Sequence, residues 1–354
     1  MSWIAFTLLL LALGWIGVGS FKGYIQDKKM TTDLPQGAGI IFSGLWFGLS
    51  IVLIYYDIVP MHYCWIFLPT VFVSYIAFLE DCDRVSSRTR LIAQVIAVYV
   101  SYYFIDLDIM NVNVLGYQVG ALGLHKIPQW GVFSLIVLGI LWMSQIMDRM
   151  DKMDGFVATH SLFVFGVGGL VLYSAGAYSL ATLAFGLCSL IGGFAIWNWP
   201  VAKVVMGKSG TLFLGVVLSV LALYSYQLFN VPLETWIILI SPFLVDASLT
   251  VIRQMIAREN FLEIMPNHAY QRLVQTGFSP VKLLCGLIML DSVLASLVLW
   301  AYKEPELLSV ITVASLGLVL IIYGLIEYKK PMYKSWNQIL SAQCGGRTEL
   351  DEVI

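Results

Sequence analysis

Strongly apolar stretches with almost no charge recur along the whole chain, separated by short polar segments. Each stretch has roughly 17–23 residues, the length of helix that crosses about 30 Å of hydrocarbon. Because backbone groups in lipid must bond within their own segment, we predict helices here. The pattern therefore predicts an all-α, polytopic membrane protein with about eleven transmembrane helices: Trp3–Phe21, Gly37–Tyr56, Tyr63–Leu79, Leu91–Ile105, Trp130–Met147, Phe156–Ala175, Tyr178–Trp197, Thr211–Phe229, Leu233–Val251, Leu283–Tyr302 and Leu307–Tyr323.

The positive charges predict the orientation of these helices. Eleven crossings divide the loops into two sets, and 18 of the 20 Lys and Arg residues fall in one set. Only Lys126 and Lys303 fall in the other. Since loops rich in Lys and Arg stay in the cytoplasm, we predict an N-terminus outside and a cytoplasmic C-terminus.

The chain is predicted to form one transmembrane domain over residues 1–328, followed by a cytoplasmic tail over 329–354. The first apolar stretch has no basic segment before it and no small-residue cleavage site, so we interpret it as an uncleaved helix. The longest external loop is predicted to be Asp106–Gln129. Within it, Val112–Leu115 and Gly116–Gly123 are candidates for a small hairpin.

Composition agrees with the membrane assignment. The chain is 59% hydrophobic and 12% charged, whereas soluble domains are about 45–50% apolar and about 25% charged. A net charge of -2 without a basic, aromatic-rich patch excludes a nucleic-acid partner. The five cysteines show no C-x-x-C spacing, which favours packing roles.

Two adjacent acids end the third predicted span. Glu80 and Asp81 repel each other at a membrane boundary, where charge is costly. A metal, a cationic partner or an acid–base role would offset this repulsion. The alternative is a solvated loop with internal ion pairs to the arginines that follow, of which Arg90 is the nearest to the next span.

Three acids recur at every third residue after the fifth span. Asp148, Asp151 and Asp154 would project from roughly one side of a helical turn. That arrangement is typical of a site for a divalent metal, for a metal-bound pyrophosphate, or for hydrogen bonds to a sugar or base. Neutralisation by Arg149 and Lys152 is the structural alternative.

Two glycine-containing loops are candidate phosphate sites. Lys28 and Lys29 precede PQGAG and the second span, so they can hold a phosphate or a lipid head group, or merely anchor the helix. Lys208 lies in the turn GKSGT before the eighth span, where backbone N–H groups can approach a phosphate.

The longest predicted internal loop, Asp246–Pro280, carries the segment NHAYQRL. His268, Gln271 and Arg272 combine an imidazole, an amide and a guanidinium, a set that suits binding of a phosphate or nucleotide. A lone histidine is more often structural.

Taken together, these loops resemble the polyprenyl-phosphate N-acetylhexosamine-1-phosphate transferase family, in the form typical of O-antigen initiating enzymes. The resemblance covers nearly the whole chain and follows the family's loop order. It rests on PQGAG, LEDCDRVSSRTRLIAQ, WMSQIMDRMDKMDG, NWPVAKVVMGKSGTLFLG and DASLTVIRQ followed by HAYQRLVQTGFS.

This resemblance implies transfer of a sugar 1-phosphate from a UDP-N-acetylhexosamine to undecaprenyl phosphate, with release of UMP, in a bacterial inner membrane. It implies Mg²⁺ as cofactor, undecaprenyl phosphate, UDP-sugar and membrane lipid as partners, and allows a homodimer. Matching the motifs assigns catalytic roles to Glu80, Asp81, Asp151 and Asp154, and metal binding to Asp148. Substrate binding is assigned to Lys28, Lys29, Arg90, Lys208, His268, Gln271 and Arg272.

The chain departs from the family pattern at several of these positions, where it carries Glu80, Gln145, Asp148, Lys152, Lys208 and Met265. In family members the positions matched by Asp148 and Lys208 both contact Mg²⁺. We therefore hypothesise that Asp148 and Lys208 form a direct ion pair in the metal's place, so that turnover is weak, metal-independent or absent.

Two alternative functions follow from the same observations. The first is a non-catalytic family member that binds polyprenyl phosphate or a partner. The second is a transporter, since Asp291 lies within the tenth span and Asp246 lies deeper than the loops. The other acids lie at cytoplasmic span ends, which favours a reaction at the membrane surface.

Overall fold

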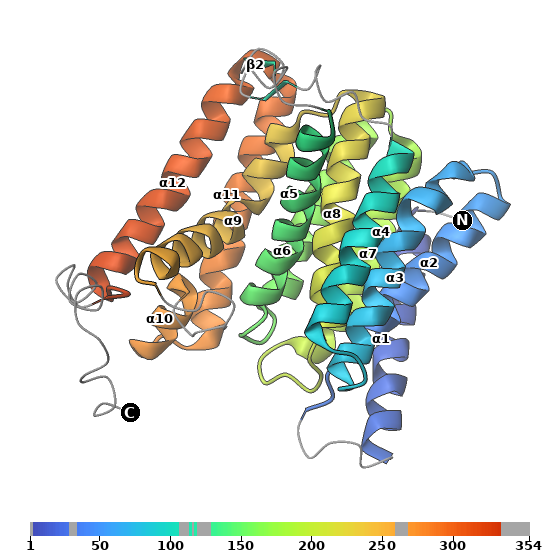
Figure 1. Ribbon diagram of the computed structural model, residues 1–354, viewed down its shortest axis with the longest axis horizontal. Coiled ribbons are helices and arrows are strands. Elements are labelled where there is room, and N and C mark those ends of the chain that lie inside the picture. Colours follow the sequence, from blue (N-terminus) through green and yellow to red (C-terminus); the bar gives the residue numbers. More distant parts are fainter. Residues whose placement is uncertain are drawn as a thin grey trace.

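The structure is a computed structural model that describes residues 3–27, 34–105, 113–114, 117–118, 129–258 and 268–333. In this part of the chain it consists of long, roughly parallel helices, one short helix and a two-stranded hairpin (Figure 1). The elements are α1 (Trp3–Asp27), α2 (Gly39–Tyr55), α3 (His62–Asp81), α4 (Ser87–Ile105), β1 (Asn113–Val114), β2 (Tyr117–Gln118), α5 (Gln129–Met150), α6 (Phe156–Ser174), α7 (Tyr178–Asn198), α8 (Gly207–Phe229), α9 (Leu233–Ile256), α10 (Ala269–Gln275), α11 (Pro280–Lys303), the 3₁₀ turn η4 (Pro305–Leu307) and α12 (Leu308–Lys329).

The predicted all-α, multi-pass fold is confirmed. Each predicted span overlaps one of the long helices. Among the described residues, nine helices are long and apolar enough to cross a membrane. Helix α2 is apolar but has only 17 residues, and α4 is not among the nine. The number of crossings and their direction therefore stay predictions.

Several predicted boundaries were wrong, and the errors fall beside the candidate site. Helix α8 begins at Gly207 rather than at Thr211, so Lys208 lies in its first turn. Helix α9 continues to Ile256, beyond the predicted end at Val251, so part of the predicted loop Asp246–Pro280 is helical. Polar residues at these ends are helical because neighbouring side chains and backbone groups satisfy their hydrogen bonds, which hydropathy does not detect.

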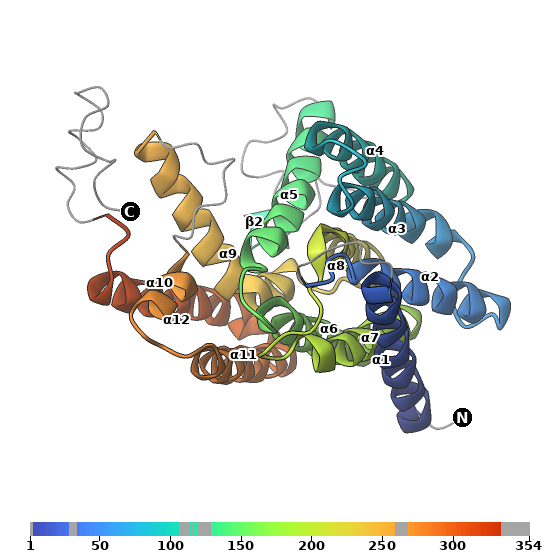
Figure 2. The ribbon, with the colours of Figure 1, turned by 90° about the horizontal axis from the view of Figure 1, so that it is seen from below.

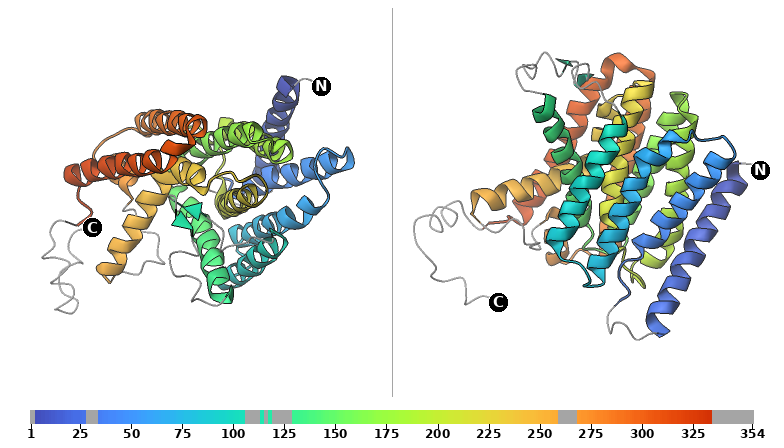
Figure 3. Two further views of the ribbon diagram at one scale, coloured as in Figure 1. Left: turned by 90° about the horizontal axis from the view of Figure 1, so that it is seen from above. Right: turned by 45° about the vertical axis from the view of Figure 1, so that its right-hand side comes forward.

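The small hairpin is confirmed in its two described strands, and its external side stays a prediction. β1 pairs antiparallel with β2, and Asn113 lies opposite Gln118. The hairpin lies at the end of the bundle opposite α10 (Figures 1 and 3).

The centre of the bundle is formed by α7 and α8. Helix α8 packs on α3 and α5, while α7 packs on α1 and α6. Viewed end-on, α8 lies between the α3–α5 side and the α6–α7 side (Figure 2). Most residues of α8 are buried, which is unusual for a membrane helix at the lipid boundary and typical of an interior one.

A close helix–helix approach fixes α8 against α5. A Cβ atom added at Gly215 would lie 2.4 Å from the Cα of Ser144. Small residues allow such contact between backbones, and packing of this kind drives helix association where lipid is as apolar as the side chains. This contact sets the position of the α8 N-terminus relative to the acids at the end of α5.

The loops with the candidate residues lie together at one end of the bundle. The ends of α3, α5 and α7 and the start of α8 lie at the same end as α10 (Figure 1). The last turns of α9 project away from the other helices (Figure 3). The fold therefore gathers four segments of the sequence into one polar surface.

We predict that Gly215→Ala lowers the stability of the purified protein by about 1–3 kcal/mol, because the added methyl group overpacks the α5–α8 contact. Gly139→Ala on α5 is the matched control, since a Cβ there meets nothing within 4 Å. That control should be neutral or stabilising, because alanine favours helix more than glycine does. Thermal unfolding in detergent measures both; equal melting temperatures for the two variants would contradict the predicted contact.

Candidate active site

The carboxylate of Asp81 holds the N-terminus of α8. Its Oδ1 accepts a hydrogen bond from the backbone N–H of Lys208 at 3.1 Å, and its Oδ2 accepts one from Ser209 at 3.1 Å. The first turn of a helix has N–H groups without internal partners and a partial positive charge, so a carboxylate there is doubly favourable. Asp81 therefore joins the end of α3 to the start of α8.

The neighbouring acid, Glu80, is the centre of an ion cluster. Lys208 Nζ lies 2.8 Å from its Oε1, and Arg90 Nε forms an ion pair with its Oε2. Ser87 also donates to Oε1 at 2.6 Å. Glu80 is only 8% exposed, whereas the Lys208 side chain is 37% exposed. The lysine therefore lies between a buried carboxylate and the open end of the bundle.

This geometry corrects the predicted ion pair between Asp148 and Lys208. The partner of the Lys208 ammonium is Glu80, and Asp148 Oδ1 instead accepts a hydrogen bond from Thr211 Oγ1 at 3.1 Å. The prediction failed because Lys208 begins α8 beside the end of α3, a neighbour far away in sequence. The predicted pair of Arg90 with the Glu80–Asp81 loop is confirmed for Glu80.

The glycine-rich first loop packs directly on the start of α8. Val205 N–H donates to Pro35 O at 2.9 Å, and Gly39 N–H donates to Met206 O at 2.9 Å. A Cβ at Gly39 would lie 2.0 Å from the backbone N of Gly210, so no larger residue fits there. The loop with the PQGAG motif and the helix start with the GKSG motif thus contact each other directly. Lys28 and Lys29 lie outside the described residues.

The three recurring aspartates converge, although they do not share a helix as predicted. Asp148 lies in the last turn of α5, and Asp151 and Asp154 lie in the turn that follows. Asp154 Oδ2 accepts a hydrogen bond from Ala202 N–H at 3.0 Å, which ties this turn to the segment before α8. Asp148 is buried, and the other two are partly buried.

Burial and neighbouring charges raise the pKa of one of these acids, Asp151. Burial, followed by the nearby charges of Asp148, Asp81 and Asp154, raises the pKa of Asp151 to about 7, against a smaller opposing effect of Lys152. Asp151 is therefore near half-protonated at neutral pH. A carboxyl group in this state can accept or donate a hydrogen bond to a substrate.

Asn198 is a supporting residue that sequence reasoning missed. Its Oδ1 accepts a hydrogen bond from Gly155 N–H at 2.9 Å, and its Nδ2 donates to Val204 O at 2.9 Å. It thereby connects the aspartate turn with the segment before α8. Its place in the NWP motif was the available signal.

The last loop approaches the aspartates through Tyr270, whose hydroxyl donates to Met150 O at 3.3 Å. Burial and the charges of Asp246 and Asp151 raise the pKa of this tyrosine, so it stays a hydrogen-bond donor. His268 is 1% exposed, stacks on Tyr270 and lies 3.7 Å from Asp246. Asp246 in turn accepts from the N–H of Ala269 at 2.9 Å.

Two residues of this loop that were predicted to bind substrate form hydrogen bonds and an ion pair within the protein. Gln271 Oε1 accepts from His268 N–H at 3.1 Å, at the start of α10. Arg272 is 2% exposed, pairs with Glu327 and donates to Lys330 O at 2.8 Å. The Arg272 side chain therefore points toward α12. Asp291 pairs with His160 inside the bundle, at 3.1 Å.

The carboxylates of Glu80 and Asp81 are not free to bind a divalent cation. Glu80 is neutralised by Lys208 and Arg90, and both oxygens of Asp81 accept backbone N–H groups. In the ranges that the structure describes, no three His, Cys, Asp or Glu side chains gather as metal ligands. Mg²⁺ prefers several free oxygen ligands in octahedral geometry, whereas an ammonium group lies at the centre of this site.

Comparison with known proteins shows which protein family this part of the chain resembles. The profile of the family described as "Glycosyl transferase family 4" matches residues 63–226. That segment covers nearly all of α3 to α8, and with them the ion cluster, the aspartate turn and the start of α8. Over these residues the chain is similar to the family 4 glycosyl transferases. The resemblance predicted from the loop motifs is thereby confirmed.

Individual relatives of this family are distant in sequence. A "Probable undecaprenyl-phosphate N-acetylglucosaminyl 1-phosphate transferase" of Bacillus subtilis (strain 168) is 25% identical over 211 residues, 58% of this chain and 56% of the relative. A "Phospho-N-acetylmuramoyl-pentapeptide-transferase" of Bacillus pumilus (strain SAFR-032) is 24% identical over 267 residues, 70% of this chain and 78% of the relative. The chain thus spans just over half the length of the first relative.

We predict a pH-dependent stabilisation by Asp151→Asn. The native pKa near 7 exceeds the ordinary value of 3.8, so the native state binds this proton more tightly than the unfolded state does. Wild-type stability should therefore fall as the pH rises from about 4 to about 7. The melting temperature of Asp151→Asn minus that of wild type should increase from pH 5 to pH 8.

Thermal unfolding at matched ionic strength measures this difference. Asp83→Asn, at an exposed position in the α3–α4 turn, controls for the loss of one surface carboxylate. A difference between Asp151→Asn and wild type that does not change with pH would contradict the raised pKa.

Proposed function

We propose that this protein transfers a sugar 1-phosphate from a UDP-N-acetylhexosamine to undecaprenyl phosphate, releasing UMP in cell-envelope glycan synthesis. The observation that carries this proposal is the match over residues 63–226, because that segment contains the whole ion cluster and aspartate turn. One relative is named as an undecaprenyl-phosphate N-acetylglucosaminyl 1-phosphate transferase and the other as a phospho-N-acetylmuramoyl-pentapeptide-transferase, which supports the proposal. Which hexosamine is used, and whether the product starts an O-antigen, belong to this proposal.

The reaction would be an in-line displacement at phosphorus. A phosphate oxygen of the lipid attacks the sugar-bearing phosphorus of the UDP-sugar; the new P–O bond forms as the P–O bond to UMP breaks, and UMP leaves with the electron pair. Such reactions depend mainly on positioning and charge stabilisation. With a second pKa near 6, the attacking phosphate is largely a dianion at neutral pH, so a strong general base is unnecessary.

Positive charge must bring the two phosphates together. Lys208 is placed to supply it, because its ammonium is partly exposed and stands in the first turn of α8, whose N-terminus itself attracts anions. Arg90 shares Glu80 with this lysine, so the negative charge of Glu80 remains compensated while Lys208 turns to a phosphate. On this basis we propose that the reaction proceeds without Mg²⁺.

The aspartate turn would position the nucleotide sugar. Asp151 and Asp154 lie beside the ion cluster, and the raised pKa of Asp151 allows it to share a hydrogen bond with an anionic or hydroxyl oxygen. His268 stacks on Tyr270 and would keep the last loop ordered. The proposed setting is the bacterial inner membrane, with these loops on the cytoplasmic side.

A non-catalytic relative is the second candidate function. It is favoured by the Lys208–Glu80 pair, because this pair can also lock the site in a state that binds a lipid phosphate without turning it over. The two candidates share their ligands and differ only in UMP release.

We predict that purified protein releases UMP only when undecaprenyl phosphate and one of a panel of UDP-N-acetylhexosamines are both present. Asp154→Asn should reduce this rate by about 10²-fold or more, because the amide keeps the bond to Ala202 N–H but removes the charge near the substrate. Asp83→Asn should leave the rate unchanged. Binding of UDP-sugar without UMP release in any combination would favour the non-catalytic candidate.

A further inference from the structure

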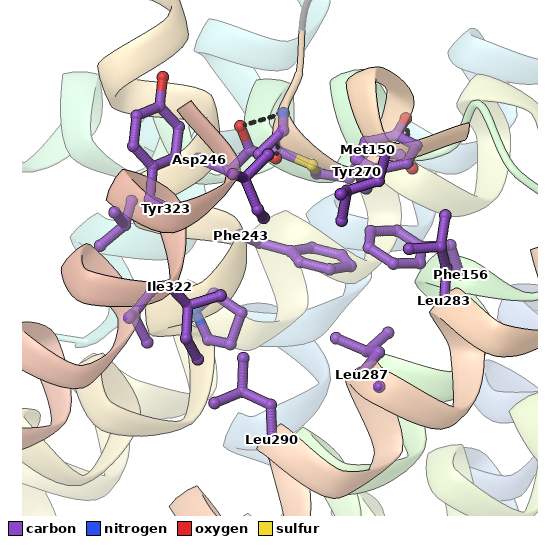
Figure 4. A pocket seen from close by; sticks show the side chains of 17 residues that line it. Met150, Phe156, Phe243, Asp246, Tyr270, Leu283, Leu287, Leu290, Ile322 and Tyr323 are labelled. Atoms are coloured by element: carbon purple, nitrogen blue, oxygen red, sulfur yellow. Dashed lines mark hydrogen bonds between the residues drawn. The ribbon is translucent and has the colours of Figure 1, made fainter. Parts of the chain in front are cut away.

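An apolar cavity of about 220 Å³ lies between α9, α11 and α12, and Met150, Phe156 and α10 close it on the side of the aspartate turn. Phe243, Leu287, Leu290 and Ile322 line its walls, and Tyr270 closes it at the α10 end (Figure 4). An engineered apolar cavity of roughly 150 Å³ stays dry and binds benzene. A cavity of this size and lining therefore suits a segment of hydrocarbon chain rather than water.

The cavity opens sideways, between α11 and α12. Gly286 lines it and is also exposed, so this wall has an opening to the outside. The two helices are joined through η4 at the far end and separate toward α10 (Figure 1). Their outer faces at this depth carry exposed apolar side chains, among them Met289 and Ile321, as expected of a surface in contact with lipid.

Polar groups gather at one end of the cavity. The hydroxyl of Tyr323 and the carboxylate of Asp246 point to the same end, away from Leu290 (Figure 4). Two guanidinium groups, those of Arg253 and Arg272, lie 5.4 Å from the Tyr323 ring centroid. Positive charge and an apolar cavity thus adjoin each other at the membrane boundary.

Several buried donors at this end lack an acceptor. Arg272 uses Nη1 for Glu327 and Lys330 O, but its Nε and Nη2 have no hydrogen-bond partner among the described residues. The Tyr323 hydroxyl likewise has none in that part of the chain. Arg272 is 2% exposed and Tyr323 is 6% exposed. Unpaired buried donors are costly, so an acceptor is expected to bind here.

The unpaired donors at this end favour an anionic acceptor. Glu327 is shared between Arg253 and Arg272, and the other carboxylate here, Asp246, already accepts the N–H of Ala269. Lys282 lies in the first turn of α11 and Lys329 in the last turn of α12. Phosphate oxygens accept charge-assisted hydrogen bonds from arginine and attract juxtamembrane lysines.

We propose that this cavity is a binding site for an anionic phospholipid of the surrounding bilayer. One acyl chain enters between α11 and α12 and fills the cavity, and the phosphate accepts hydrogen bonds from Arg272 and Tyr323. The bound lipid would brace α10, and with it His268, from the side opposite the ion cluster. This site does not depend on the proposed transferase reaction, and its test does not require turnover.

The test compares lipid-dependent thermal stabilisation of the purified, delipidated full-length protein. Dioleoyl-phosphatidylglycerol should raise the melting temperature by several degrees, and dioleoyl-phosphatidylcholine by clearly less. Gly286→Leu, which fills the opening, should abolish most of this shift. Gly324→Leu on α12 is the matched control, because a Cβ there also meets nothing within 4 Å but the residue does not line the cavity.

Tyr323→Phe tests the head-group contact separately. Since the hydroxyl has no partner among the described residues, this variant should melt at or above the wild-type temperature without lipid and lose the preference for phosphatidylglycerol. It also carries the test if Gly286→Leu does not fold. Equal shifts with both phospholipids, a full shift in Gly286→Leu, or a shift with undecaprenyl phosphate alone would each overturn the phospholipid site.

Discussion

Asp81 accepts hydrogen bonds from the N–H groups of Lys208 and Ser209, and so joins two helices across 127 residues of sequence. This contact fixes the orientation of the α8 first turn, and three other contacts depend on that turn. Lys208 reaches Glu80, Thr211 reaches Asp148, and Gly210 meets the start of α2. The acids at the ends of α3 and α5 and the glycine-rich loop are therefore ordered around one helix N-terminus.

Charge balance explains the unusual residues of this site. Five carboxylates, those of Glu80, Asp81, Asp148, Asp151 and Asp154, approach the same end of the bundle. Without a cation they would repel one another, and the raised pKa of Asp151 shows part of that repulsion. Lys208 and Arg90 compensate the rest at Glu80. An ammonium group supplies one charge and three donors but cannot bridge several phosphate oxygens as a dication does.

The sequence predicted the helices and the order of the loops well, because a run of about 20 apolar residues has few alternatives in a membrane. It predicted the identity of the site residues less completely. Contacts such as Lys208 with Glu80 depend on how α3 meets α8, and hydropathy contains no information on helix neighbours. The start of α8 was misjudged for the same reason: Lys208 is polar, yet Asp81 accepts its backbone N–H and so satisfies the helix there.

Arg272 illustrates a different limit. The motif HAYQRL placed it beside a nucleotide, whereas the structure pairs it with Glu327 on α12, 55 residues later in sequence. Motif matching transfers roles by position, while burial and partner decide what a side chain can contact. Asn198, by contrast, lay in a recognised motif and was overlooked because an amide that bonds only backbone groups has no charge pattern to mark it.

We propose that the Lys208–Glu80–Arg90 cluster takes the place of a divalent cation. The rate of UMP release from undecaprenyl phosphate and UDP-N-acetylhexosamine, measured with excess EDTA and with Mg²⁺ in wild type and in Lys208→Asp, tests this proposal. We expect equal wild-type rates in both conditions, and a Lys208→Asp variant that is inactive in EDTA and gains rate with Mg²⁺. A wild-type rate that is abolished by EDTA and restored by Mg²⁺ would contradict it.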